Sequence, residues 1–137
     1  MKILIVDGSK SVRENLIRYL ELENKFEEVF EAETVKEAKK QMKKNIIDVV
    51  LFDIQLPGTS GLELLTLSRR MHRKPIMILC SNYKFPQYMS IYENMSVNYF
   101  FDKSSELAEL KSFIKKLVMN GRTHTLQSIQ KTKFKLN

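Results

Sequence analysis

Residues 49–53, Val-Val-Leu-Phe-Asp, decide the fold, because four apolar residues run without a polar break and end on a carboxylate. A short, continuous apolar run of this kind is typical of a strand buried on both faces of a parallel sheet. Three other short runs end in a similar way: Ile3–Val6 before Asp7, Ile76–Cys80 before Ser81, and Tyr99–Phe101 before Asp102 and Lys103. The carboxyl ends of parallel strands meet at one edge of a sheet, where ligands bind. Two carboxylates, a hydroxyl and an ammonium group are therefore expected to converge there.

Helical patterns separate the apolar runs. The first expected helix covers residues 10–22 and is capped by Ser9, and the second runs from the Thr34/Glu37 capping box to Lys44. The third covers residues 62–71, and the fourth starts at Pro86. The fifth is capped by Ser104 or Ser105 and ends at Asn120-Gly121. Residues 26–30 indicate a further short strand, and residues 55–61 a loop. This alternation predicts an α/β fold with helices on both faces of a parallel sheet.

Length and composition limit the possible classes. A chain of 137 residues suits one domain, and no segment approaches the roughly 18 apolar residues of a membrane span. The first apolar run is too short for a signal peptide, and Cys80 is the only cysteine, so we expect a reduced, cytoplasmic setting. We expect residues 1–120 to form the domain.

The net charge of +7 describes the C-terminal end of the chain. Residues 1–110 contain 16 basic and 16 acidic residues, whereas residues 111–137 contain seven basic residues and no acidic one. We expect residues 121–137 to be a basic tail, either flexible or an extension of the last helix. The sequence contains neither a Gly-rich loop of the kind that binds phosphate nor the His/Cys spacing typical of a zinc site.

The residues at the strand ends suit phosphoryl transfer. Asp53 is the natural nucleophile, because a carboxylate can form an aspartyl phosphate. Mg²⁺ binds in proteins through one or two carboxylates and keeps several waters, so Asp7 and Asp53 are its candidate ligands. Lys103 would offset the charge of the phosphoryl oxygens, and Ser81 would donate a hydrogen bond to one of them.

These motifs resemble the receiver domain of two-component response regulators over about residues 2–119. The matching residues are Ile3–Asp7, Asp53–Pro57, Gly61, Ser81 and Lys103, in the order and spacing of that family. The resemblance implies a flavodoxin-like, doubly wound (βα)5 fold with a five-stranded parallel sheet of order 2-1-3-4-5.

The resemblance also implies the site. Asp53 would be phosphorylated by a sensor histidine kinase or a phosphotransfer protein, with Asp7, Asp53 and Gln55 at the Mg²⁺ ion. Phe100 takes the position of the aromatic switch residue that moves with the hydroxyl of Ser81.

Two positions depart from the family pattern. Gly8 stands where the family has a second acid that ligates Mg²⁺, so we expect weakened metal binding. Water can fill the vacated coordination position. Ser104 follows Lys103 where the family usually has proline.

The leading hypothesis is a stand-alone receiver that switches protein contacts on the face of the fourth helix, fifth strand and fifth helix. It would not be an enzyme beyond its own phosphorylation and dephosphorylation, and we expect neither a DNA-binding domain nor a membrane partner. Four aromatic residues near that face add to the argument: Tyr83, Phe85, Tyr88 and Tyr92. The alternative, favoured by Gly8, is a phosphorylation-independent interaction module. A third, weaker hypothesis is a tail-driven adaptor for nucleic acid or an acidic partner.

Overall fold

The protein is described by a computed structural model, which covers residues 1–23, 26–82 and 86–120. Five parallel strands form the central sheet in the order β2-β1-β3-β6-β7, and this confirms the predicted order 2-1-3-4-5. Their bounds are β1 Lys2–Val6, β2 Glu28–Ala32, β3 Val49–Phe52, β6 Ile76–Ser81 and β7 Tyr99–Asp102.

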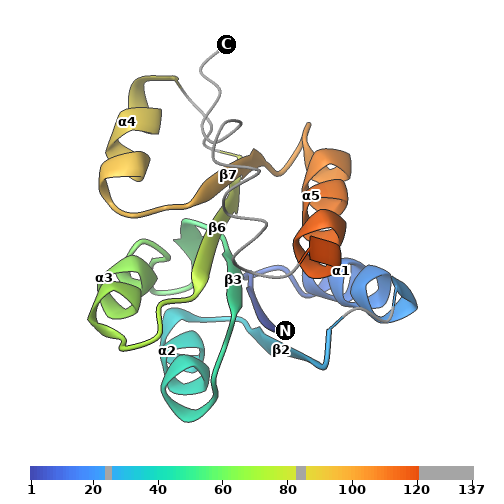
Figure 1. Cartoon of the computed structure of the whole chain (residues 1–137). Coiled ribbons are helices and arrows are strands. Elements are labelled where there is room, and N and C mark those ends of the chain that lie inside the picture. Colours follow the sequence, from blue (N-terminus) through green and yellow to red (C-terminus); the bar gives the residue numbers. More distant parts are fainter. Residues whose placement is uncertain (24–25, 83–85, 121–137) are drawn as a thin grey trace.

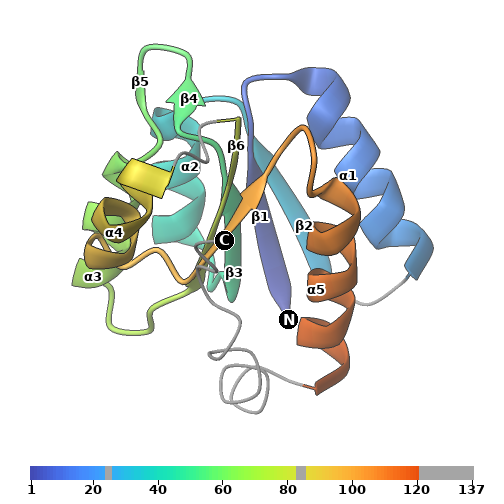
Figure 2. The ribbon, with the colours of Figure 1, turned by 90° about the horizontal axis from the view of Figure 1, so that it is seen from above.

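Five helices return the chain between the strands. Their bounds are α1 Lys10–Glu23, α2 Val35–Lys44, α3 Glu63–Arg70, α4 Pro86–Asn94 and α5 Leu107–Asn120. Helices α1 and α5 cover one face of the sheet, and α2, α3 and α4 cover the other (Figures 1 and 2). Among the described residues, no helix has the length and apolar character that crossing a membrane requires.

The sheet residues explain why the chain folds this way. Every residue of β3 and β6 is buried, as the continuous apolar runs predict for central strands. The side chains of β1 alternate between the two layers: Ile3 and Ile5 pack with α1 and α5, and Leu4 and Val6 with α2, α3 and α4. All strands therefore end at one edge, which places the predicted site there.

The helix caps follow the sequence signals in part. Ser9 Oγ accepts the backbone N–H of Val12 at 3.4 Å, and Thr34 Oγ1 accepts that of Glu37 at 3.2 Å, as predicted. The second half of the capping box differs, because Glu37 Oε2 accepts the N–H of Glu33 at 2.8 Å and not that of Thr34. The predicted end of α5 at Asn120-Gly121 falls partly outside the described residues, and the basic tail, residues 121–137, lies wholly outside them.

Three predicted details were wrong. The second strand covers 28–32 and not 26–30, because its register places Val29 opposite Ile3. The expected loop 55–61 contains a two-stranded hairpin, β4 (Gln55–Leu56) with β5 (Thr59–Ser60). Ser104 and Ser105 do not cap α5, which begins at Leu107, because both donate backbone N–H groups to Asp102 in the preceding turn.

Candidate functional site

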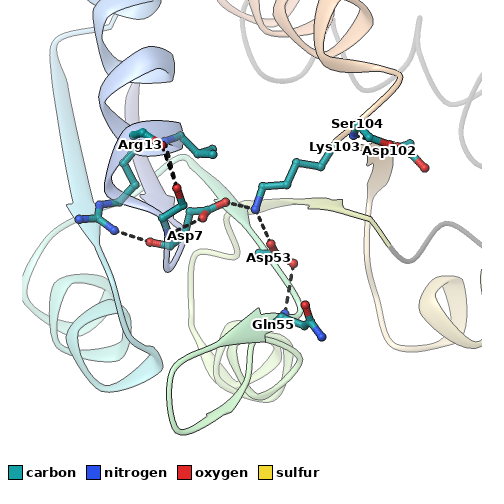
Figure 3. A network of polar contacts seen from close by, with 10 residues as sticks. Asp7, Arg13, Asp53, Gln55, Asp102, Lys103 and Ser104 are labelled. Carbon is teal, nitrogen blue, oxygen red and sulfur yellow. Dashed lines mark hydrogen bonds and ion pairs between the residues drawn. The ribbon is translucent and has the colours of Figure 1, made fainter.

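The ends of three parallel strands bring Asp7, Asp53 and Lys103 together. Lys103 Nζ lies 2.6 Å from Asp7 Oδ2 and 2.6 Å from Asp53 Oδ2, so one ammonium group bridges both carboxylates (Figure 3). Asp7 follows β1, Asp53 follows β3 and Lys103 follows β7. Both aspartates are buried, with 6% and 7% of their surface exposed. The predicted convergence of these residues is present in the structure.

The electrostatic balance of the site favours a charged Lys103. Burial acts to lower the pKa of its ammonium group, but the hydrogen bonds to Asp53 and Asp7 outweigh burial and raise the pKa above its usual value. With two carboxylates and one ammonium, the three groups carry one net negative charge. The site is therefore less negative, and attracts a dication less strongly, than a site with one further carboxylate.

Asp7 is held in place from both sides. Its Oδ1 accepts the backbone N–H of Ser9 at 2.8 Å, which leaves Oδ2 directed at Lys103. Arg13, a buried guanidinium from the first turn of α1, donates from Nη1 to the Asp7 carbonyl at 2.5 Å (Figure 3). Its Nε donates to Glu31 at 3.0 Å. Arg13 was not identified from the sequence. Its position beside Val12 on the inner face of the predicted helix was a signal, because a charged side chain on an inner face needs a polar partner.

Asp53 is fixed by the hairpin that follows it. Asp53 Oδ1 accepts the backbone N–H of Gln55 at 3.1 Å, while the exposed Gln55 side chain is directed away from the carboxylate (Figure 3). Gly61 donates its N–H to the Ile54 carbonyl at 2.7 Å. A Cβ at Gly61 would lie only 1.8 Å from the Asp53 carbonyl oxygen, so only glycine fits at this close approach.

Ser81 and Phe100, the predicted hydroxyl and aromatic switch residues, are both buried in strands of the sheet. Ser81 ends β6, is fully buried, and accepts the backbone N–H of Lys103 on its carbonyl at 3.0 Å. Phe100 is 6% exposed, and its ring centroid lies 5.1 Å from that of Tyr92 on α4. Burial raises the pKa of the neighbouring Cys80 thiol to about 12, which agrees with an unreactive core cysteine.

The donor set suits Mg²⁺ only sparingly. Two carboxylates at one strand edge match the one or two that Mg²⁺ uses alongside water. No group of three or more His, Cys, Asp or Glu side chains suited to a metal occurs in the described part of the chain. At Gly8, a Cβ would lie 3.1 Å from Pro57 Cδ, so the hairpin partly occupies the space beside the missing acid.

Comparison with known proteins gives a consistent picture. Regulatory protein VanR of Enterococcus faecium is 42% identical over 57% of this chain and 33% of its own length. Sensory transduction protein LytT of Bacillus anthracis is 29% identical over 84% of this chain and 48% of its own length. The chain thus spans about half or less of the length of these curated relatives.

Solved structures extend the comparison to three dimensions. The response regulator TrrA of Thermotoga maritima, solved in complex with Mg²⁺ and BeF, is 34% identical, with a TM-score of 0.72 over 85% of this chain and 97% of that one. A CheY-like receiver domain of Methanospirillum hungatei is 25% identical, with a TM-score of 0.75 over 86% of this chain and 93% of that one. The family described as the response regulator receiver domain matches residues 3–115. This chain therefore belongs to the response regulator receiver domain family, whose standard function is phosphorylation-based signalling in two-component systems.

Proposed function

We propose that Asp53 is the phosphoryl acceptor of this receiver and that Lys103 is the cation that supports the transfer. The observation that carries the proposal is the position of Lys103 Nζ, 2.6 Å from a carboxylate oxygen of Asp53 and 2.6 Å from one of Asp7. Charge neutralisation and positioning are the main requirements of phosphoryl transfer. The raised pKa of Lys103 keeps this cation charged at neutral pH.

The proposed reaction requires no redox partner. A carboxylate oxygen of Asp53 attacks the phosphorus of a phosphohistidine on a sensor kinase or phosphotransfer protein. The new O–P bond forms as the P–N bond breaks, and the histidine, which takes a proton from solvent, leaves as neutral imidazole. Water later attacks the acyl phosphate, which releases inorganic phosphate and restores the carboxylate. The phosphorylation and dephosphorylation of its own Asp53 are the only reactions that we propose the chain catalyses.

Asp7 and Asp53 would hold Mg²⁺, and the backbone at Gln55 would complete the protein's share of the site. When bound, Mg²⁺ supplies charge neutralisation at the phosphoryl oxygens. Gly8 removes one negative charge from this site, so we propose that the metal binds more weakly than at a site with a further acid. Water would supply the ligand that an acidic side chain at residue 8 would otherwise provide.

Ser81 and Phe100 would pass the signal from the phosphate to the surface. Ser81 would donate its hydroxyl to a phosphoryl oxygen, and Phe100 would follow into the space that the shift leaves. Because Phe100 packs on Tyr92, this motion reaches α4 directly. We propose that a downstream protein reads the change on the face of α4, β7 and α5, in the cytoplasm. A buried, reduced Cys80 is consistent with that compartment.

A second candidate function is a phosphorylation-independent interaction module. The position of Pro57 favours it, because a Cβ at residue 8 would lie 3.1 Å from Pro57 Cδ and the hairpin is thus close to the place of a third carboxylate. Phe100 is buried and packs against Tyr92, and a module of this kind would hold that packing whether or not Asp53 is phosphorylated. The two candidates differ in whether any ligand at Asp53 changes that face.

Acetyl phosphate and beryllofluoride test the proposal. Each is added with and without Mg²⁺ to the full chain and to Asp53→Asn, and the products are followed by intact mass and by NMR of the Phe100 and Tyr92 rings. A metal-dependent mass gain that Asp53→Asn lacks, with shifts of both rings, is the expected result. No adduct at millimolar Mg²⁺ would leave the interaction module as the function. An adduct without ring shifts would contradict the switch but not the acceptor.

A further inference from the structure

The edge of the sheet opposite Asp53 brings the C-terminal ends of α2 and α3 together. The α2–β3 loop contacts the α3–β6 loop through an ion pair of Asp48 with Arg73, and the Ile76 N–H donates to the Asp48 carbonyl at 2.8 Å. Strands β3 and β6 start side by side, with Val49 opposite Ile76. Helices α2 and α3 therefore end next to each other (Figures 1 and 2).

Exposed cations gather where these helices end. We name this set the α2–α3 basic surface, and its residues are Lys43, Lys44, Arg69, Arg70 and Lys74. Residues 35–74 contain only four acidic side chains. Asp48 and Asp53 are buried, and Glu37 and Glu63 lie in the first turns of α2 and α3, far along each helix from this surface. The cations thus meet no exposed carboxylate within their own segment.

Helix stability explains part of this charge but not the apolar features beside it. Basic residues in a last turn interact favourably with the helix dipole, by about 0.3–1 kcal/mol each. Ile46, however, is 62% exposed in the α2–β3 loop. A pocket of about 190 Å³ opens beside α3, and its lining combines the cations Arg69 and Lys74 and the residues Pro75, Ile76 and Met77 with the polar residues Ser68, Ser96 and Asn98.

The pocket size points to a side chain and not to a larger molecule. Sites for drug-sized ligands measure roughly 300–1,000 Å³, whereas an engineered cavity of about 150 Å³ binds benzene. A pocket of about 190 Å³ lies near the lower value. One aliphatic or aromatic side chain would fill it, while flanking acidic residues would meet the surrounding cations.

We propose that the α2–α3 basic surface docks an acidic protein segment that carries apolar side chains, one of them seated in this pocket. Charge complementarity fixes the acidic character of the partner. Ile46 and the pocket walls favour a protein over nucleic acid, whose phosphates need cations but no apolar contact. This docking is independent of the function proposed at Asp53, because the two sites lie at opposite ends of the strands.

Binding of a synthetic peptide of alternating Asp/Glu and Leu to the full chain tests the proposal, with amide NMR shifts as the map. The variant Lys43→Gln/Lys44→Gln is compared with Lys115→Gln/Lys116→Gln, another exposed lysine pair, on α5, whose replacement removes the same charge. Ile46→Ser is compared with Leu22→Ser, which alters another exposed apolar residue at the end of α1. Poly-L-glutamate serves as an acidic polypeptide without apolar side chains, and a single-stranded DNA oligonucleotide serves as a polyanion that is not a protein.

The expected result is a set of shifts at residues 43–46 and 69–77. We expect affinity to fall about tenfold for Lys43→Gln/Lys44→Gln and severalfold for Ile46→Ser, with both controls within about twofold of the parent. Equal losses for the two lysine pairs would overturn the proposal, because binding would then follow net charge alone. Tighter binding of DNA or poly-L-glutamate, with no effect of Ile46→Ser, would also overturn it.

Discussion

At the scale of single residues, Gly61 matters as much as the charged groups around Asp53. A methyl group at Gly61 would meet the Asp53 carbonyl oxygen at 1.8 Å, so the hairpin would have to move away from the aspartate. We predict that Gly61→Ala lowers the free energy of unfolding by about 3 kcal/mol, as overpacking of a tight site does. Urea unfolding at pH 7 measures the change.

Gly58→Ala is the matched control for Gly61→Ala. Gly58 has a φ of +86°, and nothing lies within 4 Å of the added methyl group, so only backbone conformation is penalised, by about 1 kcal/mol. Both substitutions reduce the entropy of the unfolded chain alike, so that effect cancels in the comparison. Equal losses of unfolding free energy in the two variants would show that the hairpin can move away from the Asp53 carbonyl oxygen without a measurable penalty.

Lys103 is the second residue on which the site depends. We predict that Lys103→Met destabilises the protein by about 2–3 kcal/mol, because it leaves the buried carboxylates of Asp7 and Asp53 without their shared cation. We also predict that Mg²⁺ recovers more stability in this variant than in the parent, since the dication no longer competes with the ammonium group. Urea midpoints with and without Mg²⁺ measure both effects. A smaller Mg²⁺ effect in the variant would show that Lys103 does not oppose the metal.

At the scale of elements, the turn between β7 and α5 provides a test by pH. Asp102 Oδ1 accepts the hydroxyl of Ser104 at 2.6 Å and the backbone N–H groups of Ser104 and Ser105 at 2.9 and 3.1 Å. The hydrogen bond from the Ser104 hydroxyl is the main cause that holds the pKa of Asp102 below its usual 3.8. A lowered folded-state pKa adds stability above pH 3.8 that is lost as pH falls through the lowered value.

We therefore predict that Ser104→Ala moves the pKa of Asp102 toward 3.8 and costs up to about 1 kcal/mol at pH 7. The difference between parent and variant should vanish once the pH is below the folded-state pKa. An NMR titration of the Asp102 carboxyl group gives its folded-state pKa, and unfolding at pH 7 and at a pH below that measured pKa gives the stability difference. A difference of the same size at both pH values would contradict the hydrogen bond to the Asp102 carboxylate as its source.

The same turn shows where sequence reasoning reached its limit. The strand order and the meeting of Asp7, Asp53 and Lys103 were predictable, because buried strands and right-handed crossovers allow few arrangements. The turn that Ser104 and Ser105 form in place of the predicted cap was not, since a serine can either cap a helix or close a turn on Asp102. The hairpin of β4 and β5 was missed because two-residue strands carry no periodicity to detect.

At the scale of the whole molecule, the site should couple ligand binding to global stability, because its residues close the ends of β1, β3 and β7. A ligand that binds only the folded state stabilises it by RT ln(1 + [L]/Kd), which is about 1.4 kcal/mol at ten times Kd. In a domain of this size that corresponds to a rise in Tm of roughly 3–6 °C. We predict such a rise with beryllofluoride and Mg²⁺ together.

Gly8 decides how much of that rise Mg²⁺ alone produces. We predict a small shift in the parent at millimolar Mg²⁺ and a larger one in Gly8→Asp, whose carboxylate adds the missing negative charge. Gly8→Ala is the control, because its Cβ makes the same contact with Pro57 at 3.1 Å without adding charge. If all three proteins show the same Mg²⁺ shift in calorimetry, the third carboxylate does not limit metal affinity, and the hairpin position would be the remaining explanation. A larger shift in Gly8→Asp alone would assign the weakness to the missing charge and show that Pro57 can yield to a side chain.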